Sequence, residues 1–240
     1  EFYQRRAQAL DPTAAAPFRL ALAVLLENEL GRPEAALDQL EEIVRDLPTH
    51  ADAITRIEAM RSSDGLKERA VEILRPLYES ADDWKRMIKL NEDRFQLAPD
   101  PHERVAILRE TAQLWEYRGG EPARARRVVA EAFKLLPEEE ETRLELERLV
   151  EITTEWSFLA GIYAAVLIEH PDLANRRDVL ARLAELEDEK LDDPRAALSS
   201  YRVLVRFDTS DLGAVCAIER LATLLADWLS LEEALGAFSD

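Results

Sequence analysis

The residues that could bind a metal or attack a substrate are few and widely separated. The three histidines, His50, His102 and His170, each lie within two residues of a proline, and no His-x-x-x-His pair occurs. We therefore interpret them as ordinary residues of helix boundaries. The single cysteine, Cys216, has small apolar neighbours and no histidine nearby. We expect it to be a small buried helix residue, since a reactive thiol needs a partner that lowers its pKa.

Motifs for nucleophilic catalysis and phosphate binding are also absent. The chain has no Gly-x-Ser-x-Gly, and Gly119-Gly120 is an isolated turn signal, not part of a glycine-rich loop. The Glu-x-x-His signature of di-iron helical bundles does not occur either. Paired carboxylates are so frequent that they carry no information about acid–base catalysis. The sequence therefore predicts a protein that is not an enzyme and has no cofactor or metal.

The composition favours an all-helical protein with an acidic surface. The 240 residues include 47% hydrophobic residues and only 7 glycines, and the net charge is -18. A protein that neutralises phosphates would carry the opposite charge, so nucleic acids and anionic membranes are unfavourable partners. A basic partner would be steered toward such a surface, although acidity also simply keeps a protein soluble.

The sequence gives limited information on location and origin. No apolar run is long enough to span a membrane, and no signal peptide is seen. The chain begins at Glu1 without Met, so we expect the natural N-terminus to be missing. Together with the single cysteine, these features favour a cytoplasmic protein. Arg outnumbers Lys by 26 to 5, which is typical of a GC-rich bacterial genome.

The most informative pattern is a leucine-rich stretch that runs into a tryptophan. Trp84, Trp156 and Trp228 each follow an acidic residue and are spaced by 72 residues. Pro122, Trp156, Pro194 and Trp228 mark a finer spacing of 34, 38 and 34 residues. A fixed period of this kind indicates a stacked repeat array. The 72-residue period therefore predicts two unlike helical hairpins, and the recurring tryptophans are expected to pack in the core rather than to bind a ligand.

A second pattern places a small residue before bulky ones at +4 and +7 and a proline at +12. It reads Ala36, Leu40, Ile43 and Pro48, and it returns at Ala125 and Ala197, where Thr209 replaces the proline. A similar pattern begins at Leu159, and a weaker one at Met87. The small residue lets two helices approach, and proline ends the second. This pattern resembles the second helix of tetratricopeptide (TPR) repeats. The usual first-helix pattern of that family is absent, so the repeats are degenerate.

The resemblance implies an all-α, right-handed superhelical solenoid of antiparallel helix hairpins, with about 14 helices. We expect the chain to be one repeat array, cut from a longer protein at both ends. Because helix 65–79 fits both hairpin roles, we expect one extra helix. The predicted segments are a tail of a preceding repeat at 1–12, repeats at 13–48 and 49–80, an irregular extra helix at 81–100, and repeats at 101–137, 138–171, 172–209 and 210–240.

The resemblance also implies a protein–protein interaction scaffold whose first helices line a concave groove for a peptide or partner helix. The partner-binding candidates are first-helix residues that packing does not use: Arg109, Gln113, Arg148 and Glu151. Two alternatives stay open. The array could be a structural spacer or an oligomerisation module that docks through its ends. More remotely, it could bind RNA, as other helical-hairpin repeats do.

Overall fold

The computed structural model describes residues 3, 10–63, 65–207, 211–227 and 229, and in these ranges it contains twelve α-helices, one short π-helix and no strand. The prediction of about 14 helices is therefore too high for the described residues, because helices expected at 1–10 and 229–238 lie almost wholly outside them. The chain divides into two compact units, Glu1–Glu103 and Arg104–Asp240. Each unit is described by itself.

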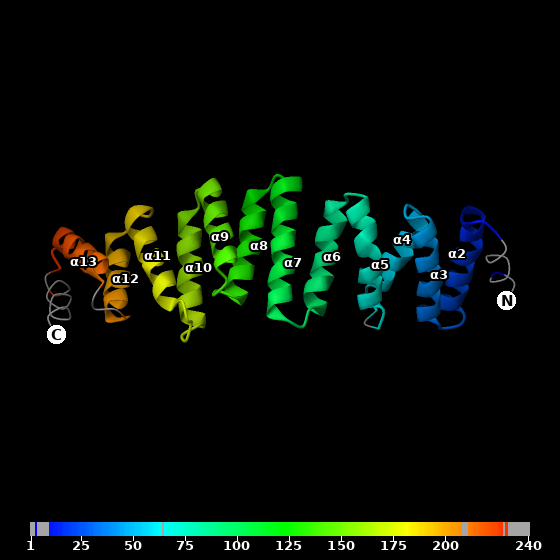
Figure 1. The fold of residues 1–240 in the computed structure, drawn as a ribbon, viewed down its shortest axis with the longest axis horizontal. Helices are drawn as coiled ribbons and strands as arrows, with labels where there is room; N and C mark the ends of the chain where they lie inside the picture. The colour runs from blue at the N-terminus through cyan, green and yellow to red at the C-terminus, as the bar shows by residue number, and fades with distance from the viewer. Residues whose placement is uncertain (1–2, 4–9, 64, 208–210, 228, 230–240) are drawn as a thin grey trace. The chain divides into compact units, whose positions relative to one another are not determined.

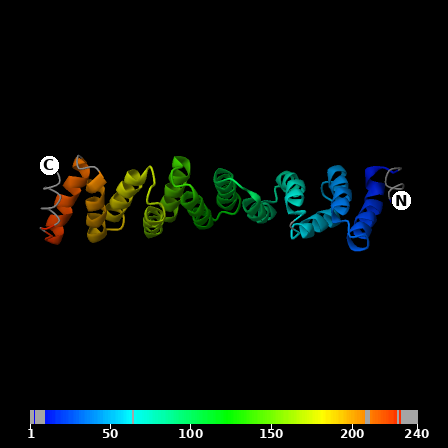
Figure 2. The ribbon, with the colours of Figure 1, turned by 90° about the horizontal axis from the view of Figure 1, so that it is seen from below.

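The first unit is a series of antiparallel helices joined by short turns (Figures 1 and 2). Its helices are α2 (Pro12–Asn28), α3 (Pro33–Asp46), α4 (Ala51–Met60), α5 (Lys67–Ser80) and α6 (Trp84–Leu97). The short α4 packs between longer neighbours, and Tyr78 on α5 donates a hydrogen bond to Glu58 on α4 at 2.5 Å. Helix α5 is also linked to α3, since Arg69 on α5 forms ion pairs with Asp38 and Glu41 on α3.

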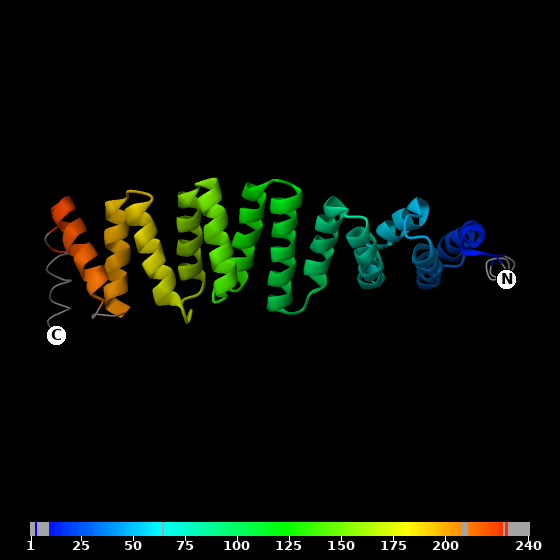
Figure 3. The same ribbon diagram turned by 45° about the horizontal axis from the view of Figure 1, so that its top comes forward.

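The second unit continues the same alternation of up and down helices (Figure 3). Its helices are α7 (Pro101–Gln113), which begins three residues before the unit boundary, the π-helix η1 (Leu114–Arg118), α8 (Pro122–Leu135), α9 (Glu140–Thr153), α10 (Trp156–Glu169), α11 (Arg176–Glu189), α12 (Pro194–Phe207) and α13 (Leu212–Leu225). Helices α7, α9 and α11 are first helices of hairpins, and α8, α10 and α12 are the second helices. The predicted repeat segments stay a prediction, and the second helix expected in 210–240 lies almost wholly outside the described residues.

Prolines fix where the helices of a hairpin begin and end. Helices α3, α8 and α12 open with proline, at a position where the missing N–H costs nothing. Helices α3, α8 and α10 stop two residues before Pro48, Pro137 and Pro171, because the residue before proline is forced out of the helical conformation. The regular spacing of these prolines therefore gives second helices of similar length.

A backbone feature recurs at the turn between the two helices of a hairpin. One residue there adopts a positive φ. These residues are Gly31, Asp82, Gly120, Thr154, Asp192 and Ala226. From Asp82 onward they are spaced by 38, 34, 38 and 34 residues. In the turns at 31, 120 and 192, the preceding N–H bonds to the carbonyl five residues back (3.0–3.2 Å), and the following N–H bonds six back (2.8–2.9 Å). These bonds satisfy carbonyls that a helix end would leave open.

The small residues of the second helices are fully buried between helices. Ala36, Ala125 and Ala197 are all 0% exposed. The bulky residues that follow them are also buried, and Tyr163 meets Phe133 edge-on, with ring centroids 5.7 Å apart. In the second unit these side chains belong to one continuous hydrophobic core. The pattern that resembles TPR second helices is thus the pattern that packs the hairpins.

The expectation that Cys216 is buried is wrong, because its side chain is exposed. The buried stripe of α13 is formed by Ala214, Val215, Ile218 and Leu221. Position 216 lies on the other side of the helix from position 214, since successive residues turn by about 100°. Its apolar neighbours in sequence therefore do not surround it in the fold.

Candidate functional site

The three histidines occupy helix boundaries, as the sequence predicts. The ring of His50 precedes α4 and accepts a hydrogen bond from the N–H of Ala53 at 3.3 Å. The Nε2 atom of His170, which follows α10, lies 3.2 Å from the carbonyl oxygen of Lys134. His102 lies exposed in the first turn of α7. Across the described part of the chain, no group of three or more His, Cys, Asp and Glu side chains is arranged to hold a metal ion.

One hollow of the second unit is a cleft of about 410 Å³ between α9, α10 and α11. Figure 3 shows these three helices side by side. First helices α9 and α11 supply the two walls, and the N-terminal half of α10 supplies the floor. Its lining residues are Leu144, Glu147, Arg148, Glu151, Trp156, Leu159, Tyr163, Arg182, Glu185, Leu186, Glu189 and Lys190. We call this hollow the α9–α11 cleft.

Trp156 forms one end of the cleft and is only partly buried. It is the first residue of α10, directly after the turn in which Thr154 has φ 54°. One part of the ring packs against the hydrophobic core, while the ammonium group of Lys190 lies 5.0 Å from the ring centroid. Trp156 therefore packs against the core, as the sequence predicts, while part of its ring stays accessible from the cleft. The first turn of a helix lies at the rim of a hairpin, where a large ring reaches both core and solvent.

Trp84 occupies the corresponding place in the first unit. It is the first residue of α6, follows Asp82 in a positive-φ turn, and is also partly buried. Lys85 lies 5.5 Å from its ring centroid. Trp228, the third member of the series, lies outside the described residues. The two described tryptophans thus share a position in the hairpin.

A polar network lies beneath the charged wall of the cleft. The Oε1 atom of Glu147 accepts hydrogen bonds from the hydroxyl of Tyr163 at 2.6 Å, from Arg143 at 2.8 Å and from Arg182 at 3.3 Å. Burial of the phenol, followed by its bond to this carboxylate, raises the pKa of Tyr163 above its ordinary value. Tyr163 therefore stays a hydrogen-bond donor at neutral pH and holds Glu147 in place.

Two of the four predicted partner-binding residues line the cleft. Arg148 and Glu151 lie on its α9 wall, while Arg109 and Gln113 lie on α7 and do not reach it. Arg109 instead forms ion pairs of 3.0 Å with Glu141 and Glu145, and these bonds raise its pKa against the opposing effect of desolvation. Gln113 is exposed. The structure therefore brings the α9 pair together and separates it from the α7 pair.

Several cleft residues were not predicted as site residues. The α11 wall contributes Glu185, Glu189 and Lys190, and the floor contributes Leu159. Trp156 was noticed through its period but assigned to the core. The 38-residue offset between the two hairpin types relates α9 to α11, so it places position 189 opposite position 151. That offset was the signal that could have found the second wall.

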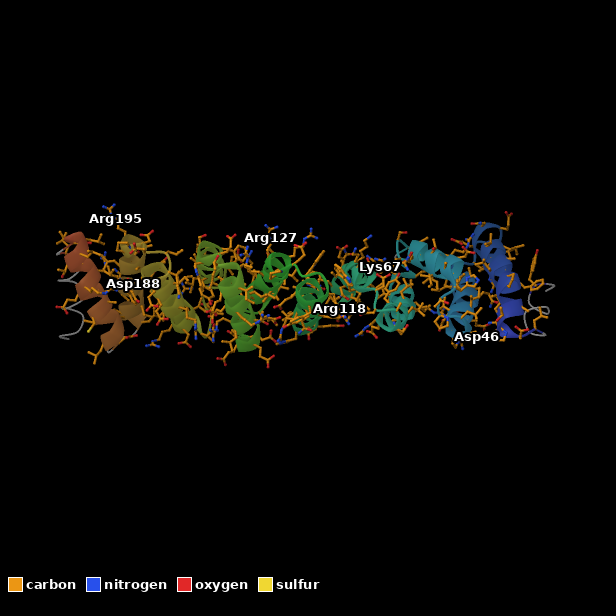
Figure 4. All side chains as sticks on the ribbon, turned by 90° about the horizontal axis from the view of Figure 1, so that it is seen from above. Asp46, Lys67, Arg118, Arg127, Asp188 and Arg195 are labelled. Carbon is orange, nitrogen blue, oxygen red and sulfur yellow. The ribbon has the colours of Figure 1, made fainter. Side chains whose placement is uncertain are left out.

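Arginine–carboxylate pairs connect each first helix of this unit to the next one. Arg148 on α9 makes two bonds of 2.6 and 2.7 Å to Glu116 on η1. Arg182 on α11 reaches Glu147 on α9, and Arg220 on α13 pairs with Asp188 on α11, which is labelled in Figure 4. Figure 4 also shows Arg127, on second helix α8, pointing away from the ribbon. Cations on the first helices are thus engaged between helices.

No protein-family model matches the sequence, and no curated protein is significantly similar to it. Solved structures do match. A thermophilic TPR protein from Thermus thermophilus is 20% identical, with 88% of this chain and 100% of that chain covered and a TM-score of 0.30. The C-terminal part of a TPR repeat-containing protein from Cytophaga hutchinsonii is 12% identical, with 90% and 92% covered and a TM-score of 0.33.

The chain's own helices define the class of protein. Consecutive helix hairpins, closed by recurring turns and packed through small residues of the second helices, make this a TPR-like repeat protein. In the described ranges no helix combines the length and the apolar character that a membrane crossing requires.

Proposed function

We propose that this protein is an interaction scaffold that holds a peptide or a partner helix against its first helices. The observation that carries the proposal is the α9–α11 cleft, with apolar side chains and a partly buried tryptophan inside a charged rim. Rigid aromatic anchors in pockets dominate the energy of protein interfaces. Stacked helix pairs commonly present such surfaces to polypeptides. Right-handed superhelical stacking, which would curve the first helices into a groove, stays a prediction.

The chemistry of the cleft supports binding rather than catalysis. Its arginines and Glu147 are held by charged or hydroxyl partners, and no nucleophile lies beside a general base among the lining residues. Its arginines are fixed between helices, so they stiffen the wall and do not gather into an anion site. A preorganised wall lowers the entropy that a partner loses on binding.

Site-specific photo-crosslinking in cells tests the proposal. A photoreactive amino acid in place of Glu151 should give a discrete crosslink to another polypeptide, and the same amino acid in place of Glu169 should not. Glu169 is also exposed, but it lies at the far end of α10 from Trp156. Trp156→Ala should abolish the crosslink at 151. Equal crosslinking from both positions, or none from 151, would remove the support for a cleft-bound partner.

A structural spacer or oligomerisation module is the second candidate. It is favoured by the exposed apolar side chains on and after α13, which are Leu212, Leu224 and Leu229. In that case Glu151 would crosslink only to other copies of the chain, and light scattering would show concentration-dependent association. RNA binding is the remote alternative. The net charge of -18 and the paired cations of the first helices oppose it, and salt-dependent binding of RNA would support it.

A further inference from the structure

The cations that line the α9–α11 cleft are already engaged. Arg148 is held by both carboxylate oxygens of Glu116, at 2.6 and 2.7 Å. Arg182 donates to Glu147 at 3.3 Å, and the Lys190 ammonium lies against the ring of Trp156. Because Arg148 makes two bonds to the same carboxylate, the plane of its guanidinium group is fixed. A ligand would therefore find few free positive charges in the cleft.

The carboxylates of the cleft divide into one that is satisfied and three that are free. Glu147 accepts bonds from Tyr163 and from two arginines. Glu151, Glu185 and Glu189 are exposed, and they form no ion pair with any residue that the structure describes. Glu151 lies on the α9 wall, and the other two lie one helical turn apart on the α11 wall. Free negative charge thus borders the cleft on both sides.

Between these walls, apolar side chains share the accessible surface with the polar ones. Leu144 is 49% exposed on the α9 wall, Leu159 and Leu186 lie deeper, and Trp156 closes one end. Burying an apolar side chain here removes water mainly from Leu144 and from the accessible part of Trp156. If the residues that flank the bound side chain in the ligand are neutral or acidic, the free carboxylates of the cleft lose water without gaining a partner, which costs free energy. A cationic neighbour would pair with them.

We propose that the α9–α11 cleft binds a segment of a partner polypeptide in which an apolar side chain is flanked by Lys or Arg on both sides. The apolar side chain occupies the cleft beside Trp156, one flanking cation pairs with Glu151, and the other pairs with Glu185 and Glu189. This inference rests on the proposed scaffold function and adds the chemistry of the partner. Selectivity comes from the free carboxylates, and affinity comes from the apolar contact.

The test is selection from a displayed library of random peptides of about twelve residues, long enough to form or mimic a docked helix or strand. The library is panned on the full chain, on Glu151→Gln/Glu185→Gln, and on the control Glu92→Gln/Glu169→Gln. The control residues are also exposed and outside any ion pair of the described residues, and both substituted chains lose the same charge. Circular dichroism of each variant checks that its helices are kept.

The full chain and the control should enrich peptides with an apolar residue between basic ones. A synthetic copy of such a peptide should bind the Glu151→Gln/Glu185→Gln variant about tenfold more weakly, and binding should weaken as salt is added. Peptides without basic flanks, or equal binding to all three proteins, would overturn the charge selectivity and leave the scaffold function standing. If no peptide is enriched on any of the proteins, both the selectivity and the scaffold function fail.

Discussion

The bond between Tyr163 and Glu147 shows how one side chain joins the core to the cleft. The ring of Tyr163 is 1% exposed and packs against Phe133, while its hydroxyl reaches the network beneath the cleft. The raised pKa of Tyr163 reflects this burial and the adjacent carboxylate. A group whose pKa is higher in the folded state stabilises the fold below its unfolded pKa, which is about 10 for tyrosine. That contribution is lost at higher pH.

Tyr163→Phe should lower the free energy of unfolding at pH 7 by about 1–2 kcal/mol, because a hydrogen bond to a charged group is lost. Above pH 10 the free energy of unfolding of the unsubstituted protein should fall with pH, in part because Tyr163 ionises only in the unfolded state. In Tyr163→Phe this ionisation is removed, so the fall should be smaller by about 1.4 kcal/mol per pH unit. Urea unfolding followed by circular dichroism at several pH values measures both effects. An unchanged slope above pH 10 would show that the ionisation of Tyr163 does not limit alkaline stability.

At this scale the sequence predicted burial well for residues on second-helix faces and poorly for residues at helix ends. Ala36 and Ala125 are buried because the helical period defines their face. Trp156 was assigned to the core because it recurs at one repeat position, and Cys216 because its sequence neighbours are small and apolar. The rim of the hairpin and the phase of α13 decide their exposure, and neither is visible from residue type alone.

The turns inside the hairpins are the element that the sequence described least. Gly119-Gly120 was recognised as a turn, but the recurrence of a positive φ at Asp82, Thr154 and Asp192 was not, because none of these residues is a glycine. The π-helix at 114–118 was also missed, since its bonds to the carbonyl five residues back leave no distinct pattern in the sequence. Helix positions, by contrast, followed from proline and the apolar period.

Gly120→Ala should destabilise the protein by about 1–2 kcal/mol, because its φ of 64° is costly for any residue with a Cβ atom. No atom lies within 4 Å of the position of the added Cβ, so the cost is conformational and not steric. Gly65→Ala is the matched control, since it also meets open space and lacks a positive φ. Its change should stay within about 0.5 kcal/mol. Equal effects of the two substitutions on the free energy of chemical unfolding would contradict a positive φ at position 120.

Thr154→Gly should have the opposite sign and stabilise the protein by about 1 kcal/mol, because a β-branched residue is poorly suited to a φ of 54°. Thr55→Gly, in the exposed middle of α4, should instead cost about 0.5–1 kcal/mol. Thermal unfolding of the two variants gives the comparison. A loss of stability in both would mean that residue 154 is not held in the left-handed region.

The bond pair between Arg148 and Glu116 joins the π-helix to α9. The side chain of Glu116 is 12% exposed, so its pairing should be stronger than that of a fully solvated pair. A double-mutant cycle on this pair should give a coupling of about 1 kcal/mol that decreases with salt. The exposed pair of Arg75 and Glu79, four residues apart on α5, should give about 0.3–0.5 kcal/mol. Equal coupling energies would mean that the pair of Arg148 and Glu116 stabilises the protein no more than an exposed pair within one helix.

For the molecule as a whole, the sequence predicted the class of fold, and two of the four predicted partner-binding residues line the α9–α11 cleft. The period, the prolines and the small residues together specify hairpins, and Arg148 and Glu151 were selected because packing does not use them. The division into two compact units was not predicted, because it depends on contacts between helices far more than on any residue pattern. The second wall of the cleft was missed for the same reason.

The central claim is that a partner polypeptide occupies the space between α9 and α11 beside Trp156. Hydrogen–deuterium exchange of the full chain, with and without a saturating cleft-binding peptide, tests it most directly. The account predicts slower exchange in α9, α11 and the first turns of α10, and unchanged exchange in α3 and α5. Slower exchange confined to other helices, or no change in α9 and α11 under saturating conditions, would contradict the account.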